Sequence, residues 1–291
     1  MKFSPSGPKT GEKMNKNLKT ALQAALGRVS PELLQAARSL RFLRACRRGY
    51  KPLQDALAPK LYPDGDIRVL HGPFEGMKYF NRTVWGPITP KWLGTYEAEL
   101  HEVMAEILKR QYATIVDVGA AEGYYAVGLA RMFPKAKVYA FDTDPFARIS
   151  LRRLTRINGI RNLCCQSTLK HPRLNALLAA PPSLLVCDIE GAELDLLNPN
   201  AAPSLCNADI LVECHRTAQG TTDQTADEIT GRFSQSHIIQ QIGVADRQIQ
   251  LLRDALPQAA RLSDGELLAA ACEHRGADQR WLWITTRTQN G

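Results

Sequence analysis

The chain has 291 residues, of which 44% are hydrophobic and 23% charged, as in an ordinary globular protein with room for one domain and an extension. No run of about 18 or more apolar residues occurs, and the first twenty residues are polar and basic, which argues against a transmembrane helix and a secretory signal. The seven cysteines include no C-x-x-C pair, which argues against a disulfide framework. We therefore expect a cytoplasmic protein that is at most peripherally associated with a membrane.

The positive charge is concentrated at the start of the chain. Residues 1–60 hold 13 Lys and Arg against 3 Asp and Glu, a net charge of +10, whereas the whole chain carries +8, which leaves −2 for residues 61–291. We expect three parts: a basic, partly disordered and helical extension over 1–60, a β-hairpin and lead-in helix over 61–110, and a ligand-binding domain over 111–291.

The extension carries one helix signal. Ser30 and Pro31 are typical of an N-cap and a first helical turn, and Gly49 is typical of the residue after a helix. Leucines recur at helical spacing among five arginines, so the helix is basic and amphipathic. Such a helix either contacts a membrane surface or nucleic acid through residues 30–51, or packs on the main domain with a solvated basic face. The sequence leaves both open, together with the oligomeric state.

Two elements are expected between the extension and the main domain. Alternating apolar and polar residues around glycines predict a short β-hairpin over Ile67–Phe80. Apolar residues at helical spacing predict a helix over Thr95–Gln111.

From Ala113 onward, short apolar runs alternate with helical segments, which indicates a doubly wound, mostly parallel α/β sheet. The expected strands are Thr114–Val118, Lys137–Phe141, Leu163–Gln166, Leu184–Cys187, Asp209–Cys214, His237–Ile242 and Trp281–Thr285.

A glycine-rich loop follows the first of these strands. The stretch "VDVGAAEGYY" places Gly119 and Gly123 between the strand and a helix expected from Tyr124. A dinucleotide site would have a third glycine where Ala121 stands, and Glu122 at the helix start would repel pyrophosphate. Together with Asp117, Asp142 and Asp144, Glu122 is expected to make the rim of this loop acidic. An acidic rim suits the sulfonium and ammonium groups of S-adenosylmethionine.

The second strand ends in an acid at the expected distance from this loop. In "KVYAFDTDP", Asp142 lies 23 residues after Gly119, where a carboxylate can accept hydrogen bonds from both ribose hydroxyls of an adenosine ligand. Asp144 is expected to cap the helix that begins at Pro145.

A second polar cluster is expected beside this loop. Asp188 and Glu190 follow the fourth strand, and Glu213 and His215 end the fifth, so neighbouring strands would bring them together. A carboxylate or His215 there could deprotonate a substrate hydroxyl, or the group could bind a divalent metal. A metal is possible but not predicted, because no metal-spacing motif is present. We expect Glu193 to lie on a helix surface.

These motifs together resemble the FkbM-like class I methyltransferases. The resemblance rests on "VDVGAAEGYYAVGLA", "AFDTDP", "CDIEGAELDLL" and "ILVECHR", preceded by "LGTYEAEL", and runs from about Leu93 to "WLWITT". It implies a seven-stranded Rossmann-like sheet with an antiparallel last strand, S-adenosylmethionine as methyl donor, and transfer to oxygen on sugars or natural products. One departure is Asp142-Thr143 where the family often has Glu-Pro.

The resemblance and the residue patterns together give the predicted site. The cofactor-binding residues are predicted to be Asp117, Gly119, Ala120, Glu122, Gly123, Asp142, Thr143 and Asp188. The catalytic residues are predicted to be Asp188, Glu190, Glu213 and His215.

The leading hypothesis is an S-adenosylmethionine-dependent O-methyltransferase acting on a small-molecule or glycan acceptor. The alternatives are methylation of RNA or another nucleic acid through the basic extension, a non-catalytic binding module of the same fold, and a nicotinamide-dependent oxidoreductase. The absence of an N-P-P-Y motif argues against base-amine methylation, and the missing glycine argues against the oxidoreductase.

Overall fold

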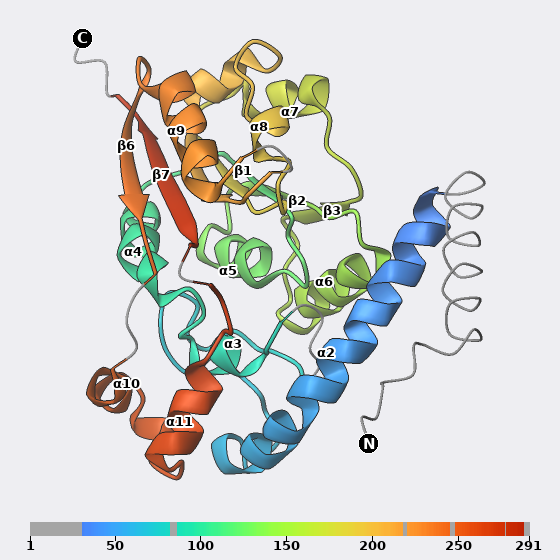
Figure 1. Ribbon diagram of the computed structural model, residues 1–291, viewed down its shortest axis with the longest axis vertical. Coiled ribbons are helices and arrows are strands. Elements are labelled where there is room, and N and C mark those ends of the chain that lie inside the picture. Colours follow the sequence, from blue (N-terminus) through green and yellow to red (C-terminus); the bar gives the residue numbers. More distant parts are fainter. Residues whose placement is uncertain (1–30, 82–85, 218–219, 245–247, 277, 288–291) are drawn as a thin grey trace, which may run out of the picture.

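A computed structural model describes residues 31–81, 86–217, 220–244, 248–276 and 278–287 (Figure 1). Its centre is a seven-stranded sheet in the order β3-β2-β1-β4-β5-β7-β6. Strands β1 to β5 pair in parallel, and β7 runs antiparallel to both β5 and β6. The strands are β1 (Thr114–Val118), β2 (Lys137–Phe141), β3 (Leu163–Gln166), β4 (Ser183–Cys187), β5 (Asp209–Cys214), β6 (His237–Ile242) and β7 (Arg280–Thr286).

The predicted fold class is therefore confirmed: the sheet is doubly wound, mostly parallel, and has an antiparallel last strand. Five of the seven strands match their predicted bounds, and β4 and β7 are longer than predicted by one and two residues respectively. The central strands were predictable because their side chains are apolar on both faces, as in sheets that are covered on both sides.

Helices cover both faces of the sheet (Figure 1). One face carries α4 (His101–Lys109), α5 (Tyr124–Met132) and α6 (Pro145–Ile157), and the other carries α7 (His171–Leu178), α8 (Glu193–Leu196) and α9 (Thr222–Phe233). Side chains alternate between the two cores along each strand, so Ile115 of β1 packs on the first face and Val116 on the second. The shorter elements are α3 (Thr89–Leu93), η1 (Ala98–Leu100), η2 (Pro203–Asn207), α10 (Ile249–Ala255), η3 (Pro257–Ala259) and α11 (Asp264–Ala271).

Local capping fixes where several helices begin. Asp144 accepts a hydrogen bond of 2.8 Å from the backbone N–H of Phe146 and so caps α6, as predicted. Thr221 and Ser263 form capping boxes with Gln224 and Glu266 at the starts of α9 and α11.

The N-terminal helix is longer than predicted. Helix α2 (Pro31–Leu61) begins at the predicted residue but continues through Gly49 and past Pro52 instead of ending at Gly49. Leu57 and Leu61 in the additional turns are buried in the main core, and this burial stabilises the helix beyond Gly49. Among the described helices, none is long and apolar enough to cross a membrane. The predicted disorder over residues 1–20 lies outside the described part of the chain.

The prediction of a β-hairpin over Ile67–Phe80 is wrong: the chain reverses direction there, but it forms no regular strands. Its ladder is reduced to a single bridge between Arg68 and Lys78. The ladder ends because Leu70 donates its backbone N–H to the carbonyl of Trp92 instead of to the opposite strand. The predicted helix over Thr95–Gln111 is shorter, as η1 followed by α4.

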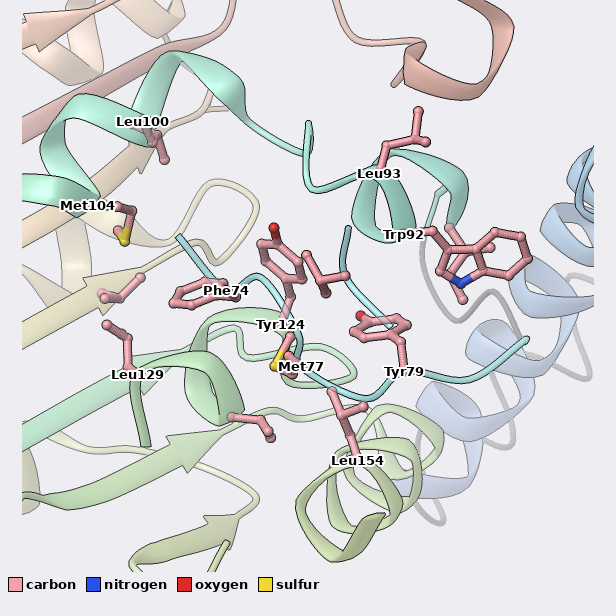
Figure 2. Close-up of a cluster of buried hydrophobic side chains, with 14 of the residues drawn as sticks. Phe74, Met77, Tyr79, Trp92, Leu93, Leu100, Met104, Tyr124, Leu129 and Leu154 are labelled. Atoms are coloured by element: carbon pink, nitrogen blue, oxygen red, sulfur yellow. The ribbon is translucent and has the colours of Figure 1, made fainter. Parts of the chain in front are cut away.

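This lead-in segment is part of the core rather than a separate unit. Figure 2 shows Phe74 and Tyr79 of the segment beside Tyr124, the first residue of α5. The rings of Phe74 and Tyr124 lie 5.2 Å apart in an edge-to-face arrangement, and Trp92 is fully buried between this cluster and α2. Residues 61–110 therefore set the position of the loop that precedes α5.

Candidate functional site

A large cavity opens at the carboxyl ends of the parallel strands. It encloses about 880 Å³, within the usual range for small-molecule sites, and lies at the point where the strand order reverses between β1 and β4. Its walls come from the loops after β1, β2, β3, β4 and β5, from residues 86–96, from the segment before β7, and from Tyr50 of α2.

The loop after β1 and the acid after β2 are bonded to each other. Asp142 Oδ2 accepts a hydrogen bond of 2.8 Å from the N–H of Ala121, and Asp142 Oδ1 accepts one of 2.7 Å from the N–H of Asp144. Burial raises the pKa of Asp142, and these two hydrogen bonds work against that shift. Because a carboxylate has about four acceptor positions, two remain for a ligand in the cavity.

Gly119 allows the first and fourth strands to end side by side. Its φ is +83°, and a Cβ atom on it would lie 1.5 Å from the backbone oxygen of Asp188. A glycine is therefore required at position 119 by the close approach of the backbone at Asp188, and not by a ligand. Gly123 has a φ of +100°, and a Cβ there would lie 3.0 Å from Leu151 of α6.

The predicted cofactor residues divide into two groups. Gly119, Asp142, Thr143 and Asp188 line the cavity, whereas Asp117, Ala120, Glu122 and Gly123 are not among the described residues that line it. Asp117 is buried behind the loop, where burial and the negative charges of Asp188 and Asp142 raise its pKa to about 8. Its Oδ2 is buried and has no hydrogen-bond partner among the described residues.

The interpretation of Glu122 as part of an acidic rim needs correction. Its side chain is only 3% exposed and forms an ion pair with Lys91, whose side chain is 5% exposed. Its Oε1 also accepts a hydrogen bond of 2.8 Å from the hydroxyl of Tyr79. Because Lys91 neutralises this carboxylate, Glu122 gives no argument against a phosphate ligand. Of the four acids predicted to form this rim, Asp142 and Asp144 line the cavity.

The four predicted catalytic residues all line the cavity, and His215 lies at their centre. Its Nε2 is 3.7 Å from Asp188 Oδ1, 3.6 Å from Glu190 Oε2 and 3.7 Å from Glu213 Oε1. The sequence predicted this convergence because the loops after β4 and β5 adjoin at one edge of the sheet. The catalytic roles themselves stay predictions.

Glu193 holds the imidazole from the other side and was misjudged. It was expected on a helix surface, but its side chain is fully buried, and its Oε1 lies 2.7 Å from His215 Nδ1. The same oxygen accepts a hydrogen bond of 3.0 Å from the N–H of Gly191. The sharp turn at Glu190 and Gly191, with φ values of +56° and +105°, turns the start of α8 toward β5 and so buries this carboxylate.

Burial and mutual repulsion change the pKa values of the residues in this cluster. Burial raises the pKa of Asp188, and the negative charge of Glu97 raises it further. Burial also raises the pKa of Glu213, with the charge of Asp188 as the next cause. Burial lowers the pKa of His215, but the hydrogen bond to Glu193 and the charge of Asp188 outweigh it, so the net shift is upward. Asp188 and Glu213 therefore keep their protons to a higher pH than isolated carboxyl groups would.

Several residues of the site were missed from the sequence. Arg275, in the segment before β7, forms ion pairs with Glu97, Glu213 and Glu273 and donates a hydrogen bond of 2.6 Å to the hydroxyl of Tyr96. Tyr50 of α2 stacks on His274 with ring centroids 5.7 Å apart. No local pattern marks these residues, because their partners lie far away in the sequence. Tyr50, Lys91, Tyr96, His274 and Arg275 all line the cavity.

No protein-family model matches the chain, and no curated protein matches its sequence, so the resemblance to the FkbM-like family stays a prediction. Solved structures of similar architecture are methyltransferases of several kinds. They include the O-methyltransferase TomG of Streptomyces achromogenes in complex with S-adenosylmethionine (10% identity, 86% of this chain and 99% of that chain, TM-score 0.43). An rRNA methylase of Streptococcus thermophilus shows 12% identity over 65% of this chain and 96% of that chain, with a TM-score of 0.42. The precorrin-6y C5,15-methyltransferase of Geobacter metallireducens shows 12% identity over 64% and 86%, with a TM-score of 0.42. Since all three TM-scores lie below 0.5, the acceptor of this chain has to be inferred from the geometry of its own site.

Proposed function

We propose that the protein is an S-adenosylmethionine-dependent methyltransferase that methylates a hydroxyl oxygen of a sugar or natural-product acceptor. The observation that carries this proposal is the placement of two different groups in one cavity. Asp142 and the Gly119 loop lie at one side, where they suit an adenosine, and the cluster around His215 lies at the carboxyl ends of β4 and β5. In a class I methyltransferase fold, the methyl donor and its acceptor would lie side by side at this edge of the sheet.

The cavity would hold the donor through the residues that line it. Asp142 has two acceptor positions left for ribose hydroxyls, and Asp188 offers a carboxylate to the positive end of the donor. Four carboxylates surround a single imidazole beyond this point. The acidic side chains that line this end of the cavity favour a ligand with a sulfonium and an ammonium group over an anionic one.

Methyl transfer is an in-line displacement that depends mainly on positioning. The electron pair of the acceptor oxygen forms the new O–C bond, and the broken C–S bond leaves its electron pair on sulfur, giving S-adenosylhomocysteine. The acceptor proton must go to a base within hydrogen-bond reach. Asp188 suits this role because its Oδ1 has no hydrogen-bond partner among the described residues and its raised pKa makes it a stronger base than an ordinary carboxylate.

A second candidate function is methylation of RNA. It is favoured by an acid-free stretch: residues 145–187 contain seven Lys and Arg and no Asp or Glu. Within it, Arg152, Arg153 and Arg156 are exposed on α6, the helix that contacts α2. Exposed arginines on one helix suit phosphate contacts. The predicted contact of residues 30–51 with a membrane surface or nucleic acid stays a prediction.

The test is methyl transfer from labelled S-adenosylmethionine to a panel of hydroxylated sugars, glycolipids and RNA. The proposal expects label in a hydroxyl acceptor, and Asp188→Asn should lower the rate about 100-fold or more. Asp227→Asn, which changes an exposed carboxylate on α9, is the matched control and should leave the rate unchanged. Label in RNA alone would select the second candidate, whereas labelling of a hydroxyl acceptor that survives Asp188→Asn would remove Asp188 from the mechanism.

A further inference from the structure

The imidazole of His215 faces three carboxylate oxygens that it does not hydrogen-bond. The distances from Nε2 to Asp188, Glu190 and Glu213 are 3.6–3.7 Å, longer than a hydrogen bond. Donor atoms that share one divalent ion at about 2.1–2.2 Å lie roughly 3.0–3.6 Å from one another. The observed separations are close to that range. The ligand atoms of Asp188, Glu213 and His215 all lie within 4.8 Å of one another, so a small movement of these side chains would bring them to the separations found around a common ion.

The buried oxygen of Asp188 points independently to a missing partner. Its Oδ1 is shielded from solvent and has no hydrogen-bond partner among the described residues. An unpaired buried oxygen costs free energy unless something compensates it. This atom faces His215 Nε2, so whatever satisfies it would lie between Asp188 and the imidazole.

Neighbouring side chains form hydrogen bonds that orient the imidazole and the carboxylates, as is usual for metal ligands. Glu193 lies 2.7 Å from His215 Nδ1, which fixes a proton on that nitrogen and directs the lone pair of Nε2 toward the carboxylates. Gln279 and Arg275 donate hydrogen bonds of 2.7 Å and 3.4 Å to Glu213 Oε1, which hold this carboxylate in place and leave its Oε2 as the oxygen with room for an ion. A ligating histidine with a buried carboxylate behind it is a common arrangement at metal centres.

The local charge also favours a cation. Asp188, Glu190, Glu193 and Glu213 surround the imidazole, and the guanidinium of Arg275 is shared among Glu97, Glu213 and Glu273. A divalent ion would offset this excess of negative charge more effectively than a proton on His215 alone.

We propose that Asp188, Glu213 and His215, with the exposed Glu190 as a further ligand, bind one divalent transition-metal ion. Mixed carboxylate and imidazole ligation suits ions such as Mn²⁺ better than Ca²⁺, which prefers oxygen ligands throughout. The ion's use in catalysis rests on the proposed function: it would bind the acceptor hydroxyl and make its proton easier to remove. Binding of the ion itself does not depend on that function.

The test is titration of chelator-treated, full-length protein with Mn²⁺ alone, followed by the electron paramagnetic resonance signal of free Mn²⁺. One ion should bind per chain. His215→Ala and Asp188→Asn should weaken binding at least tenfold, and Glu193→Gln, which only orients the imidazole, should weaken it about 10- to 100-fold. Glu228→Gln changes an exposed carboxylate on α9 and should leave the affinity unchanged.

Two controls keep the outcomes distinct. Circular dichroism identifies any variant that fails to fold, and Glu190→Gln, on a side chain that is 83% exposed, provides a variant with little risk to folding and should also weaken binding. Mn²⁺ affinity that is unchanged in folded His215→Ala, or absent from the unmodified protein, would overturn the metal site. A separate titration with S-adenosylmethionine tests the proposed function. If the protein binds S-adenosylmethionine but not Mn²⁺, only the metal site is refuted. If it binds Mn²⁺ but not S-adenosylmethionine, only the methyltransferase function is refuted.

Discussion

Gly119 and Asp188 are in such close contact that a methyl group on the glycine would lie 1.5 Å from the aspartate's backbone oxygen. The N–H of Asp188 in turn donates a hydrogen bond of 2.9 Å to Val118, the residue before that glycine. The loop predicted to bind the cofactor and the strand end predicted to carry the base are therefore one rigid unit.

Gly119→Ala should damage both halves of the site. The alanine would need a left-handed backbone, at about 1–2 kcal/mol, and would also force the ends of β1 and β4 apart, so we expect a loss of at least about 2 kcal/mol of unfolding free energy and of cofactor affinity. Urea denaturation measures the first quantity and calorimetry the second. Gly231→Ala is the control: this glycine lies inside α9 with no atom in the way, so the substitution should stabilise by about 0.5–1 kcal/mol. A fully stable Gly119→Ala protein would contradict the account.

The buried pair of Lys91 and Glu122 predicts a strongly non-additive double mutant. Lys91→Met should cost about 3–5 kcal/mol because it leaves Glu122 buried without a counter-charge, and adding Glu122→Gln should restore much of that loss. Denaturant unfolding of the two single variants and the double variant measures the coupling. The exposed pair Lys51 and Asp55 is the matched comparison, and Lys51→Met there should change stability by less than about 1 kcal/mol. Additive losses at Lys91 and Glu122 would show that the pair is not the stabilising unit.

Asp117 predicts a pH dependence of stability with a definite sign. Burial raises the pKa of its carboxyl to about 8, above the value of about 3.9 in an unfolded chain, so between these values the folded state holds a proton that the unfolded state has lost. This residue's contribution is fully present below pH 4 and declines by about 1.4 kcal/mol per pH unit until the pH passes 8. Asp117→Asn should remove that part of the slope. Equal slopes for the two proteins between pH 5 and pH 7, measured by chemical denaturation, would refute the assignment.

Tyr50 predicts that the N-terminal helix serves the acceptor end of the cavity. Tyr50→Ala removes the ring that stacks on His274, so we expect the KM for the acceptor to rise about tenfold while the affinity for the cofactor stays unchanged. Tyr50→Phe keeps the ring and should raise this KM less than Tyr50→Ala does. Deletion of residues 1–48 retains Tyr50, Leu57 and Leu61, so it should leave the fold and cofactor binding intact. Weaker cofactor binding in Tyr50→Ala would place the ring at the wrong end of the cavity.

Strand bounds were predictable from the sequence because they depend on local patterns. Apolar runs that end in an acid or a glycine gave β1, β2 and β5 without error, and the same rule placed Asp142, Asp188 and Glu213 at one edge of the sheet.

The remaining features depend on contacts between distant segments. The end of α2 was wrong because Leu57 packs on the main core, and Glu193 was misplaced because its burial results from a turn that brings it to His215, 22 residues away. Glu122 was read as a free charge, although Lys91 neutralises it from another element. None of these pairings has a local sequence pattern.

The most direct test of the account is calorimetric titration of the protein and of Asp142→Asn with S-adenosylmethionine, S-adenosylhomocysteine and NAD. The account predicts that the first two bind and NAD does not. It also predicts that Asp142→Asn, which loses a charged acceptor at the ribose, weakens both by about tenfold or more. Because the asparagine NH2 group would face one of the two backbone N–H groups that Asp142 accepts, we also expect a loss of about 1–3 kcal/mol of unfolding free energy, which denaturation measures separately. Binding of NAD alone would contradict the methyltransferase assignment, and unchanged affinities in Asp142→Asn would contradict the placement of the cofactor in this cavity.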